Sequence, residues 1–132
     1  MREIATAATH DGTFHADDAF AAAILELALG SVQVVRTRDP RAIASCDLAF
    51  DVGGLYDPER LAYDHHMADA PARPCGTPYS SAGLIWRDFG RLALAREGLE
   101  GLPASQVERA WASIDEGAIT SIDKIDNGVT PP

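Results

Sequence analysis

The sequence predicts an α/β fold, with a mostly parallel sheet flanked by helices. Short β-branched or apolar runs alternate with longer segments rich in alanine and leucine, and this alternation favours parallel strands joined by helices. In addition, His10, Asp51 and Asp64 each stand at the carboxyl end of a predicted strand, where open parallel sheets bind their ligands. The 132 residues are enough for one compact domain, which is expected to span residues 1–132.

The first predicted elements are a strand, a loop and a helix. Ile4 to Thr9 is a short apolar run that ends at His10, and the turn formers Asp11-Gly12 follow it. This segment predicts a strand and its exit loop. From Ala16 to Leu29 the chain is rich in alanine and leucine, with two aspartates in the first turn and Gly30 as a stop, and this pattern predicts a helix.

Further short strands are predicted in the middle of the chain. Val32 to Val35 is β-branched, and Arg38-Asp39-Pro40 is expected to turn the chain toward a third strand at Asp47 to Asp51. Another short strand is expected around Leu61 to Tyr63, directly before Asp64-His65-His66. The region from residue 67 to 78 is rich in Pro, Ala and Gly and predicts a long loop, a candidate lid.

Two helices are predicted in the last third. Ser80 or Ser81 can cap a helix that ends near Glu97, and Gly98 to Pro103 breaks the chain before a last helix from about Ser105 to Asp126. This last helix carries apolar residues at i, i+3, i+4 spacing, and they are expected to form one stripe on the core. The stripe consists of Val107, Trp111, Ile114, Ala118, Ile122 and Ile125.

Composition narrows the class of protein. With 11 Lys and Arg against 20 Asp and Glu, the net charge of −9 argues against a basic surface that holds nucleic acid through many phosphates. Two bound divalent cations would return four of these charges locally. Cys46 and Cys75 lack the spacing of a metal or disulfide motif and are interpreted as free thiols. No apolar run approaches the roughly 20 residues of a membrane span, and a cytoplasmic protein without a signal peptide is expected.

All four histidines fall in two clusters. His10 and His15 form one, His65 and His66 form the other, and each cluster has aspartates within two residues. Histidine and aspartate without cysteine suit a divalent cation such as Mn²⁺ better than a structural zinc, which usually takes thiolate.

The predicted topology brings these clusters together, because the carboxyl ends of parallel strands face one crevice. Two cations about 3.5 to 4 Å apart can activate a water and bind phosphoryl oxygens, so the residues predict a two-metal phosphoesterase site. The predicted site consists of His10, His15, Asp17, Asp51 and the run Asp64-His65-His66.

Each residue of the site also has an ordinary structural interpretation. His10 and His15 can be strand-end and loop residues, and Asp51 can be a turn former. Asp17 and Asp18 can simply favour the positive end of a helix, which is the preferred interpretation of Asp18. Only the combination of these residues favours the metal site.

Six segments, in one order along nearly the whole chain, carry a resemblance to a known family. They are Thr9 to Asp17, Val35 to Pro40, Asp51 to Pro58, Tyr63 to His66, Ser80 to Leu84 and Ile122 to Gly128. In these segments the chain resembles the melanocyte-proliferating-gene protein family, a branch of the Asp-His-His (DHH) phosphoesterase superfamily. The resemblance implies a DHH-phosphoesterase-like catalytic domain with two Mn²⁺ or Mg²⁺ ions. It also implies hydrolysis of phosphodiester or pyrophosphate bonds, and eukaryotic relatives look like 3′-to-5′ RNA exonucleases.

The resemblance implies a role for each metal ligand. His10 and His15 would ligate one cation, Asp17 and His65 would ligate the other, and Asp51 would bridge the two.

Further implied roles concern the substrate and a late ligand. His66 would lie near the substrate phosphate as an electrostatic or proton-donating group, and Asp64 would orient a histidine. The superfamily also uses a late aspartate as a metal ligand. A helical wheel puts Asp126 at roughly 90° from the centre of the apolar stripe and Asp123 at roughly 150°, so Asp126 is the predicted ligand. The alternative is that either residue is a solvated acid at a helix end.

The chain departs from the family pattern in three ways. Asp18 stands where glutamate is more frequent and Met67 stands where glutamine is usual, and neither residue is expected to ligate metal. Family members continue into a second, substrate-binding domain, whereas this chain stops soon after Asn127-Gly128. That second domain is therefore expected to be absent and substrate binding to be weak.

Three functions stay open at the level of sequence. The first is metal-dependent hydrolysis of phosphodiester bonds in RNA, oligonucleotides or nucleotides. The second is a small-molecule phosphatase or pyrophosphatase, which the acidic composition favours over long polymers. The third is a module that binds metal and a phosphate ligand without turnover. The long loop leaves room for a homodimer.

Overall fold

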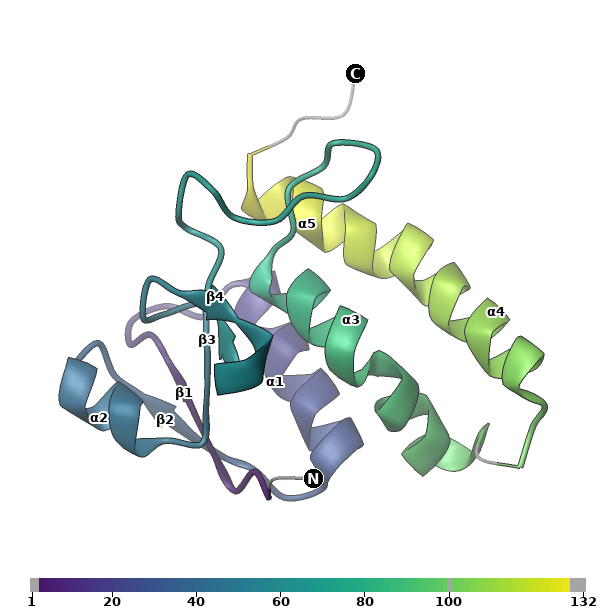
Figure 1. Cartoon of the computed structure of the whole chain (residues 1–132), viewed down its shortest axis with the longest axis horizontal. Coiled ribbons are helices and arrows are strands. Elements are labelled where there is room, and N and C mark those ends of the chain that lie inside the picture. Colours follow the sequence, from purple (N-terminus) through teal and green to yellow (C-terminus); the bar gives the residue numbers. More distant parts are fainter. Residues whose placement is uncertain (1–2, 100, 129–132) are drawn as a thin grey trace.

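The computed structural model describes residues 3–99 and 101–128, which form a five-stranded sheet with helices on either side (Figure 1). The strands are β1 (Thr6–Thr9), β2 (Gln33–Arg36), β3 (Leu48–Phe50), β4 (Tyr56–Asp57) and β5 (Ala62–Tyr63). Their order in the sheet is β2-β1-β3-β5-β4. The first four strands in that order are parallel, and β4 runs antiparallel to β5. The prediction of an α/β fold with a mostly parallel sheet is confirmed.

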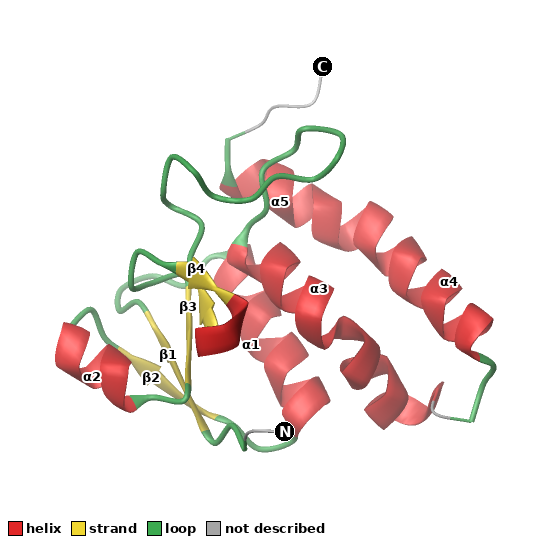
Figure 2. Cartoon of the chain, in the orientation of Figure 1, coloured by secondary structure: helices red, strands yellow, loops and turns green. Residues whose placement is uncertain are grey.

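The helices form unequal layers (Figure 2). On one side of the sheet, α1 (Ala16–Leu29) packs against α3 (Ser81–Leu94), and α2 (Pro40–Ser45) lies on the other side. Beyond α3, α4 (Ala104–Ile114) and α5 (Thr120–Asp126) form an outer layer. Among the described residues, no helix combines the length and the apolar character that crossing a bilayer requires.

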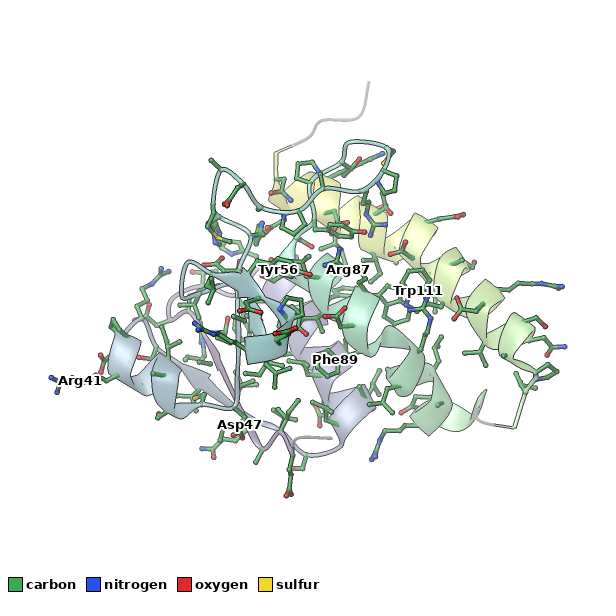
Figure 3. The ribbon with its side chains drawn as sticks, in the orientation of Figure 1. Arg41, Asp47, Tyr56, Arg87, Phe89 and Trp111 are labelled. Atoms are coloured by element: carbon green, nitrogen blue, oxygen red, sulfur yellow. The ribbon has the colours of Figure 1, made fainter. Side chains whose placement is uncertain are left out.

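The core lies between the sheet and the α1–α3 pair. Tyr63 of β5 and Phe50 of β3 are almost completely buried, and Phe89 of α3 meets the Tyr63 ring edge to face with 6.0 Å between ring centres. Figure 3 shows Phe89 on the sheet side of α3. Burial of these large rings fixes the distance between α3 and the strands, and thus where the start of α3 lies relative to the strand ends.

Helix α1 has the predicted bounds, but the two aspartates of its first turn are buried. Gly30, with φ of 85°, ends the helix, as a residue without Cβ can do at little cost. At the other end, Asp17 and Asp18 are 1% and 0% exposed. The interpretation of Asp18 as simply a helix-dipole residue is therefore wrong, because its carboxylate is buried at the end of β1, 2.6 Å from His10 Nε2.

Helix α3 begins where its serine cap was predicted. The Ser80 side chain accepts a hydrogen bond from the Gly83 backbone N–H at 3.2 Å. Gly83 has no side chain because another helix passes here: a Cβ at this position would overlap the Asp123 carboxylate. The start of α3 is therefore held directly against α5.

The predicted last helix is interrupted. Residues Asp115–Ile119 form a π-helical turn between α4 and α5, and this turn adds a residue relative to a regular α-helix. The added residue rotates the following helix by about 100°. The predicted apolar stripe is wrong in part: Ile125, after the turn, is 74% exposed and Ala118, within it, is exposed, whereas Ile119 is buried. Ile114, before the turn, is also 37% exposed.

The remainder of the stripe holds α4 to α3. Trp111 points from α4 toward α3 (Figure 3), and its indole N–H donates to the Trp86 carbonyl at 3.1 Å. The two indole rings are stacked, with 6.2 Å between their centres. Ile122 is buried as predicted.

Three short elements were not predicted. Arg38-Asp39-Pro40 does more than turn the chain, because Asp39 caps α2 by accepting from the Arg41 N–H at 3.1 Å and Pro40 begins the helix. The strand β4 and a 3-10 turn at Pro58–Arg60 precede β5. The long loop at residues 67–78 is present as predicted, with one bridge between Ala72 and Pro78.

Candidate metal centre

The predicted site residues gather at the carboxyl edge of the sheet. His10 follows β1, Asp51 follows β3 and Asp64 follows β5, so adjacent parallel strands deliver them to one place. A cavity of about 660 Å³ opens there. It is lined by His10, His15, Asp17, Asp51, His65, His66 and Asp126, together with Arg38 and Asn127.

One group of potential ligands forms around Asp18. His10 Nε2 lies 2.6 Å from Asp18 Oδ2, and His15 Nδ1 lies 3.7 Å from the same oxygen. Asp18 also accepts a hydrogen bond from the His15 backbone N–H at 3.1 Å, which holds the start of α1 against the loop. Sequence reasoning left Asp18 out of the site. The signal that could have found it is its position in the first helical turn, three residues after His15.

A second group surrounds the His65 ring. His65 Nε2 lies 3.0 Å from Asp51 Oδ1, 3.0 Å from Asp126 Oδ2 and 3.5 Å from Asp17 Oδ2. Asp17, Asp51, His65 and Asp126 each offer a ligand atom within 4.8 Å of the others. Their convergence brings together residues from α1, β3, β5 and α5.

Asn127 was not predicted in this site. Its side-chain oxygen lies 3.3 Å from His65 Nδ1, while its amide nitrogen donates to the Tyr79 carbonyl at 3.2 Å and the Asp123 carbonyl at 2.9 Å. The amide therefore holds the far side of the His65 ring and directs Nε2 toward the carboxylates.

Asp51 stands between the two groups. Its Oδ2 lies 3.2 Å from His10 Nε2, and its Oδ1 faces both His65 Nε2 at 3.0 Å and His66 Nε2 at 3.6 Å. The residue has a φ of 59°, a left-handed conformation that costs energy for a side chain other than glycine. This conformation turns the carboxylate toward the cavity.

The electrostatics of the centre are dominated by crowded carboxylates. Burial, together with the neighbouring carboxylates of Asp18 and Asp17, raises the pKa of Asp51 to about 6, although the hydrogen bond from His65 acts to lower it. Burial by itself lowers the pKa of His65, but its hydrogen bonds to Asp126, Asp17 and Asp51 outweigh that effect and raise the pKa to about 12. Protons on His65 and Asp51 therefore offset part of the carboxylate charge, and a divalent cation can replace them.

A buried oxygen in the centre lacks a donor. Among the described residues, Asp18 Oδ1 has no hydrogen-bond partner although it is buried. An ionised oxygen without a partner is costly in a protein interior, and a coordinated cation is one way to satisfy it. The residues present thus fit a divalent cation.

Asp64 organises the loop after β5. Its Oδ1 accepts from the His65 N–H at 2.8 Å and lies 2.6 Å from His66 Nδ1, and its Oδ2 accepts from the Gly54 N–H at 2.7 Å. Burial acts to raise the pKa of Asp64, but the hydrogen bonds from Gly54, His66 and His65 hold it below the ordinary value. The His66 ring is thereby oriented, although its side chain is 61% exposed.

Arg38 adds a positive charge at the rim. Its Nε donates to Asp11 Oδ1 at 2.7 Å, and its side chain lines the cavity. Sequence reasoning treated this residue only as part of a turn. It follows β2 by two positions, so the strand-end argument applied to the other strands would also have found it.

The sequence matches known proteins over most of its length. The family model MYG1_exonuc, described as Uncharacterised protein family (UPF0160), matches residues 6–131. MYG1 exonuclease of Homo sapiens is 41% identical over 132 residues, which cover 92% of this chain and 35% of that protein. The MYG1 protein of Dictyostelium discoideum is 33% identical and covers 94% of this chain and 39% of its own length.

A bacterial relative matches a shorter segment. The MYG1 protein of Chlamydia trachomatis is 40% identical over 79 residues, which cover 58% of this chain and 26% of that protein. No solved structure has a significant match. The chain thus spans about a third of the length of the first of these relatives, with 35% of the human protein covered.

Proposed function

The chain belongs to the MYG1_exonuc family, and from that membership and the geometry of its Asp and His residues we propose that it is a divalent-metal-dependent hydrolase of phosphodiester bonds. The run Asp64-His65-His66 supports the further proposal that the domain is of the DHH phosphoesterase type. The exonuclease activity named for the human relative is part of this proposal and not of the family assignment, since the chain covers only 35% of that relative.

The observation that carries the proposal is the position of Asp51. Its two oxygens face two groups of potential ligands, with His10 and Asp18 on one side and His65 on the other. A carboxylate between two cations is the usual bridge of a two-metal site. Asp51 is therefore proposed as the bridging ligand.

The other ligands divide between the two groups. His10 and His15 are proposed for one cation, and the structure favours adding Asp18 to them. Three further ligands are proposed for the second cation: Asp17, His65 and Asp126. A set of imidazoles and carboxylates suits Mn²⁺ better than Mg²⁺, which usually keeps several waters and takes few protein ligands.

Two cations bound there would supply the Lewis acidity that makes a water nucleophilic at neutral pH and offsets the charge developing on a phosphoryl group. The chain itself holds and orients the reacting groups. Asp64 holds His66 through Nδ1, so that His66 Nε2 faces the cavity and is available to donate a hydrogen bond or a proton to a phosphate oxygen. Arg38 at the rim contributes further positive charge for an anionic substrate.

The proposed substrate is RNA, an oligonucleotide or a nucleotide. The mammalian relatives are named as exonucleases, enzymes that act at a chain end. An end, or a short oligonucleotide, also suits a protein with a net charge of −9, because few phosphates must approach the acidic surface.

The test is Mn²⁺-dependent release of nucleotides from a short end-labelled single-stranded RNA. The Asp51→Ala protein serves as the control for a contaminating nuclease. Wild type is expected to release nucleotides and the variant is not. Equal release by both proteins would assign the activity to a contaminant and overturn the proposal.

The same assay separates two other functions. Turnover of pyrophosphate, without turnover of a dinucleotide or longer RNA, would identify a small-molecule phosphatase or pyrophosphatase, which the acidic composition favours. Mn²⁺-dependent binding of a nucleotide without hydrolysis would identify a binding module.

A further inference from the structure

A second cavity, of about 630 Å³, adjoins the metal centre. It shares Arg38, Asp51 and His66 with the first cavity, so the two cavities lie on either side of the same three residues. Ligand sites for small molecules have volumes of roughly 300 to 1,000 Å³, and the second cavity lies within that range. A molecule bound at the metal centre can therefore extend into it.

The walls of the two cavities differ in chemistry. The first is lined mainly by carboxylates and imidazoles, with Ala16, Ile122 and Ile125 beside them, whereas the second adds to its charged groups several apolar side chains from α2 and from the loop after β3. These side chains are Pro40, Ile43, Ala44 and Val52.

The local structure explains this apolar wall. Asp39 caps α2 at Pro40, and the turn that follows places Ile43 and Ala44 on the side that faces the cavity. Gly53, with φ of 98°, lies against Ile43: a Cβ at Gly53 would come within 3.8 Å of Ile43 Cγ2. Ile43 is only half-buried, so part of its side chain is left for a ligand to cover.

Arg38 stands at the junction of the two cavities. It reaches the site from the segment between β2 and α2, and its Nε is held by Asp11. A guanidinium in this position can donate to a phosphate at the metal centre or stack on a planar group beside it. The junction therefore fits a ligand with an anionic end and a flat, largely apolar end.

From this arrangement we infer that the second cavity is a nucleoside subsite, which takes the base and sugar of the nucleotide whose phosphate lies at the metal centre. The inference rests on the proposed function, since it requires a phosphate at that centre. A nucleobase has an apolar face for Ile43 and Val52 and polar edges for the backbone near Gly53. The subsite makes a nucleotide a better ligand than its phosphate alone.

The test compares three probes under saturating Mn²⁺ by isothermal titration calorimetry: adenosine 5′-monophosphate, ribose 5-phosphate and inorganic phosphate. Adenosine 5′-monophosphate is expected to bind at least about tenfold more tightly than ribose 5-phosphate, a factor that a modest apolar contact can supply. Equal affinities for these two probes would overturn the subsite.

A pair of variants on α2 tests the location. Ala44→Trp is expected to fill the cavity and to lower the affinity for adenosine 5′-monophosphate by about tenfold, with the affinity for inorganic phosphate unchanged. Ser45→Trp is the matched control, because Ser45 is exposed on α2 and does not line the cavity. An unchanged affinity in a folded Ala44→Trp protein would overturn the location.

Two further measurements complete the design. If Ala44→Trp does not fold, Ile43→Ala replaces it, with an expected selective loss of affinity for the nucleotide. Mn²⁺ stoichiometry is measured first on wild type. Absence of Mn²⁺ binding would overturn the proposed function and the subsite together, whereas Mn²⁺ and phosphate binding without preference for the nucleotide would overturn the subsite alone.

Discussion

Two regions of this molecule bury aspartates, and they compensate the charge in different ways. The first is the proposed metal centre, below called the metal centre, which consists of His10, His15, Asp17, Asp18, Asp51, His65, His66 and Asp126. The second is the arginine clamp, defined as Arg73, Asp115 and Asp123. Both connect segments far apart in the sequence, so each was a candidate for a functional site.

The clamp is complete by itself. Arg73 Nε donates to Asp123 Oδ2 at 2.6 Å, and its two terminal nitrogens donate to Asp115 at 2.7 and 2.9 Å. The other Asp123 oxygen accepts from Ser80, from N–H at 3.0 Å and from the hydroxyl at 2.7 Å. Burial raises the pKa of Asp123, while these donors oppose the rise. Every charge here meets a partner within the chain.

The metal centre is not complete in this way. Among the described residues, its carboxylates form ion pairs with histidines and with no arginine or lysine. Arg38 lines the cavity, but its ion pair is with Asp11. The comparison teaches that burial of acids alone does not mark a function. Buried acids without a fixed cation from the chain mark the place where an external cation fits.

The strongest way to break this comparison is to remove Asp51. Asp51→Ala should abolish turnover and weaken Mn²⁺ binding by at least about 100-fold, because a bridging carboxylate serves both cations and offsets their repulsion. Equilibrium dialysis with Mn²⁺ measures the stoichiometry.

The matched control for this change is Asp51→Asn. Asparagine tolerates the left-handed backbone at φ 59°, so it removes the charge with less backbone strain than alanine. Both variants should lose metal. Unchanged Mn²⁺ stoichiometry in either one would show that the bridge is assigned to the wrong residue.

Removal of the chain's own cation should act on stability instead. Arg73→Met leaves the fully buried Asp123 carboxylate without its partner, and about 3 to 5 kcal/mol of the free energy of unfolding should be lost. Denaturant unfolding in the presence of a chelator measures this change. Arg60→Met is the control, because the Arg60 side chain is 76% exposed and its pair with Asp57 should contribute at most about 1 kcal/mol. Similar losses in the two variants would contradict a special role for the clamp.

Addition of Mn²⁺ should stabilise the fold through the metal centre, whether or not the arginine clamp is intact. Mn²⁺ at about 100 times its dissociation constant should raise the free energy of unfolding of wild type by about 2.7 kcal/mol for each site. Thermal unfolding with and without Mn²⁺ checks this, and chelation should reverse it. The same increase is expected in a folded Arg73→Met protein, and a missing increase in wild type would argue against metal binding.

The sharpest comparison uses two aspartates of one helix. Asp126→Asn should weaken Mn²⁺ binding by at least about tenfold and change stability little, because its side chain is 19% exposed at the edge of the centre. Asp123→Asn should leave Mn²⁺ stoichiometry unchanged and cost about 1 to 3 kcal/mol of the free energy of unfolding. Calorimetric titration with Mn²⁺ and denaturant unfolding measure both effects. The comparison would be contradicted if Asp123→Asn lost Mn²⁺ affinity and Asp126→Asn lost stability.

The sequence by itself determined the class of the fold and which residues gather at the carboxyl edge of the sheet. Parallel strands end at one edge, so residues directly after β1, β3 and β5 had to meet, and His10, Asp51 and Asp64 do lie there. The bounds of α1 also followed from local composition, since alanine-rich segments between clear stops favour a helix whatever surrounds them.

The choice of Asp126 shows the limit of this reasoning. A straight helical wheel selected Asp126 over Asp123 as the residue nearer the apolar stripe, and the structure places Asp126 against His65. The wheel was nevertheless wrong about the helix, because it ignored the π-helical turn at Asp115–Ile119. Asp123, which it put toward solvent, is fully buried beside Arg73.

Only the tertiary structure decided which acids and bases have partners. Asp18 enters the metal centre because the first turn of α1 lies against the loop after β1, and Arg73 enters the core from a loop whose composition predicts only irregular structure. Local patterns report backbone preference and periodicity over a few residues. Charge compensation instead depends on distances between residues up to 65 positions apart, as between Ala82 N–H and Asp17, and those distances exist only once the helices have packed on the sheet.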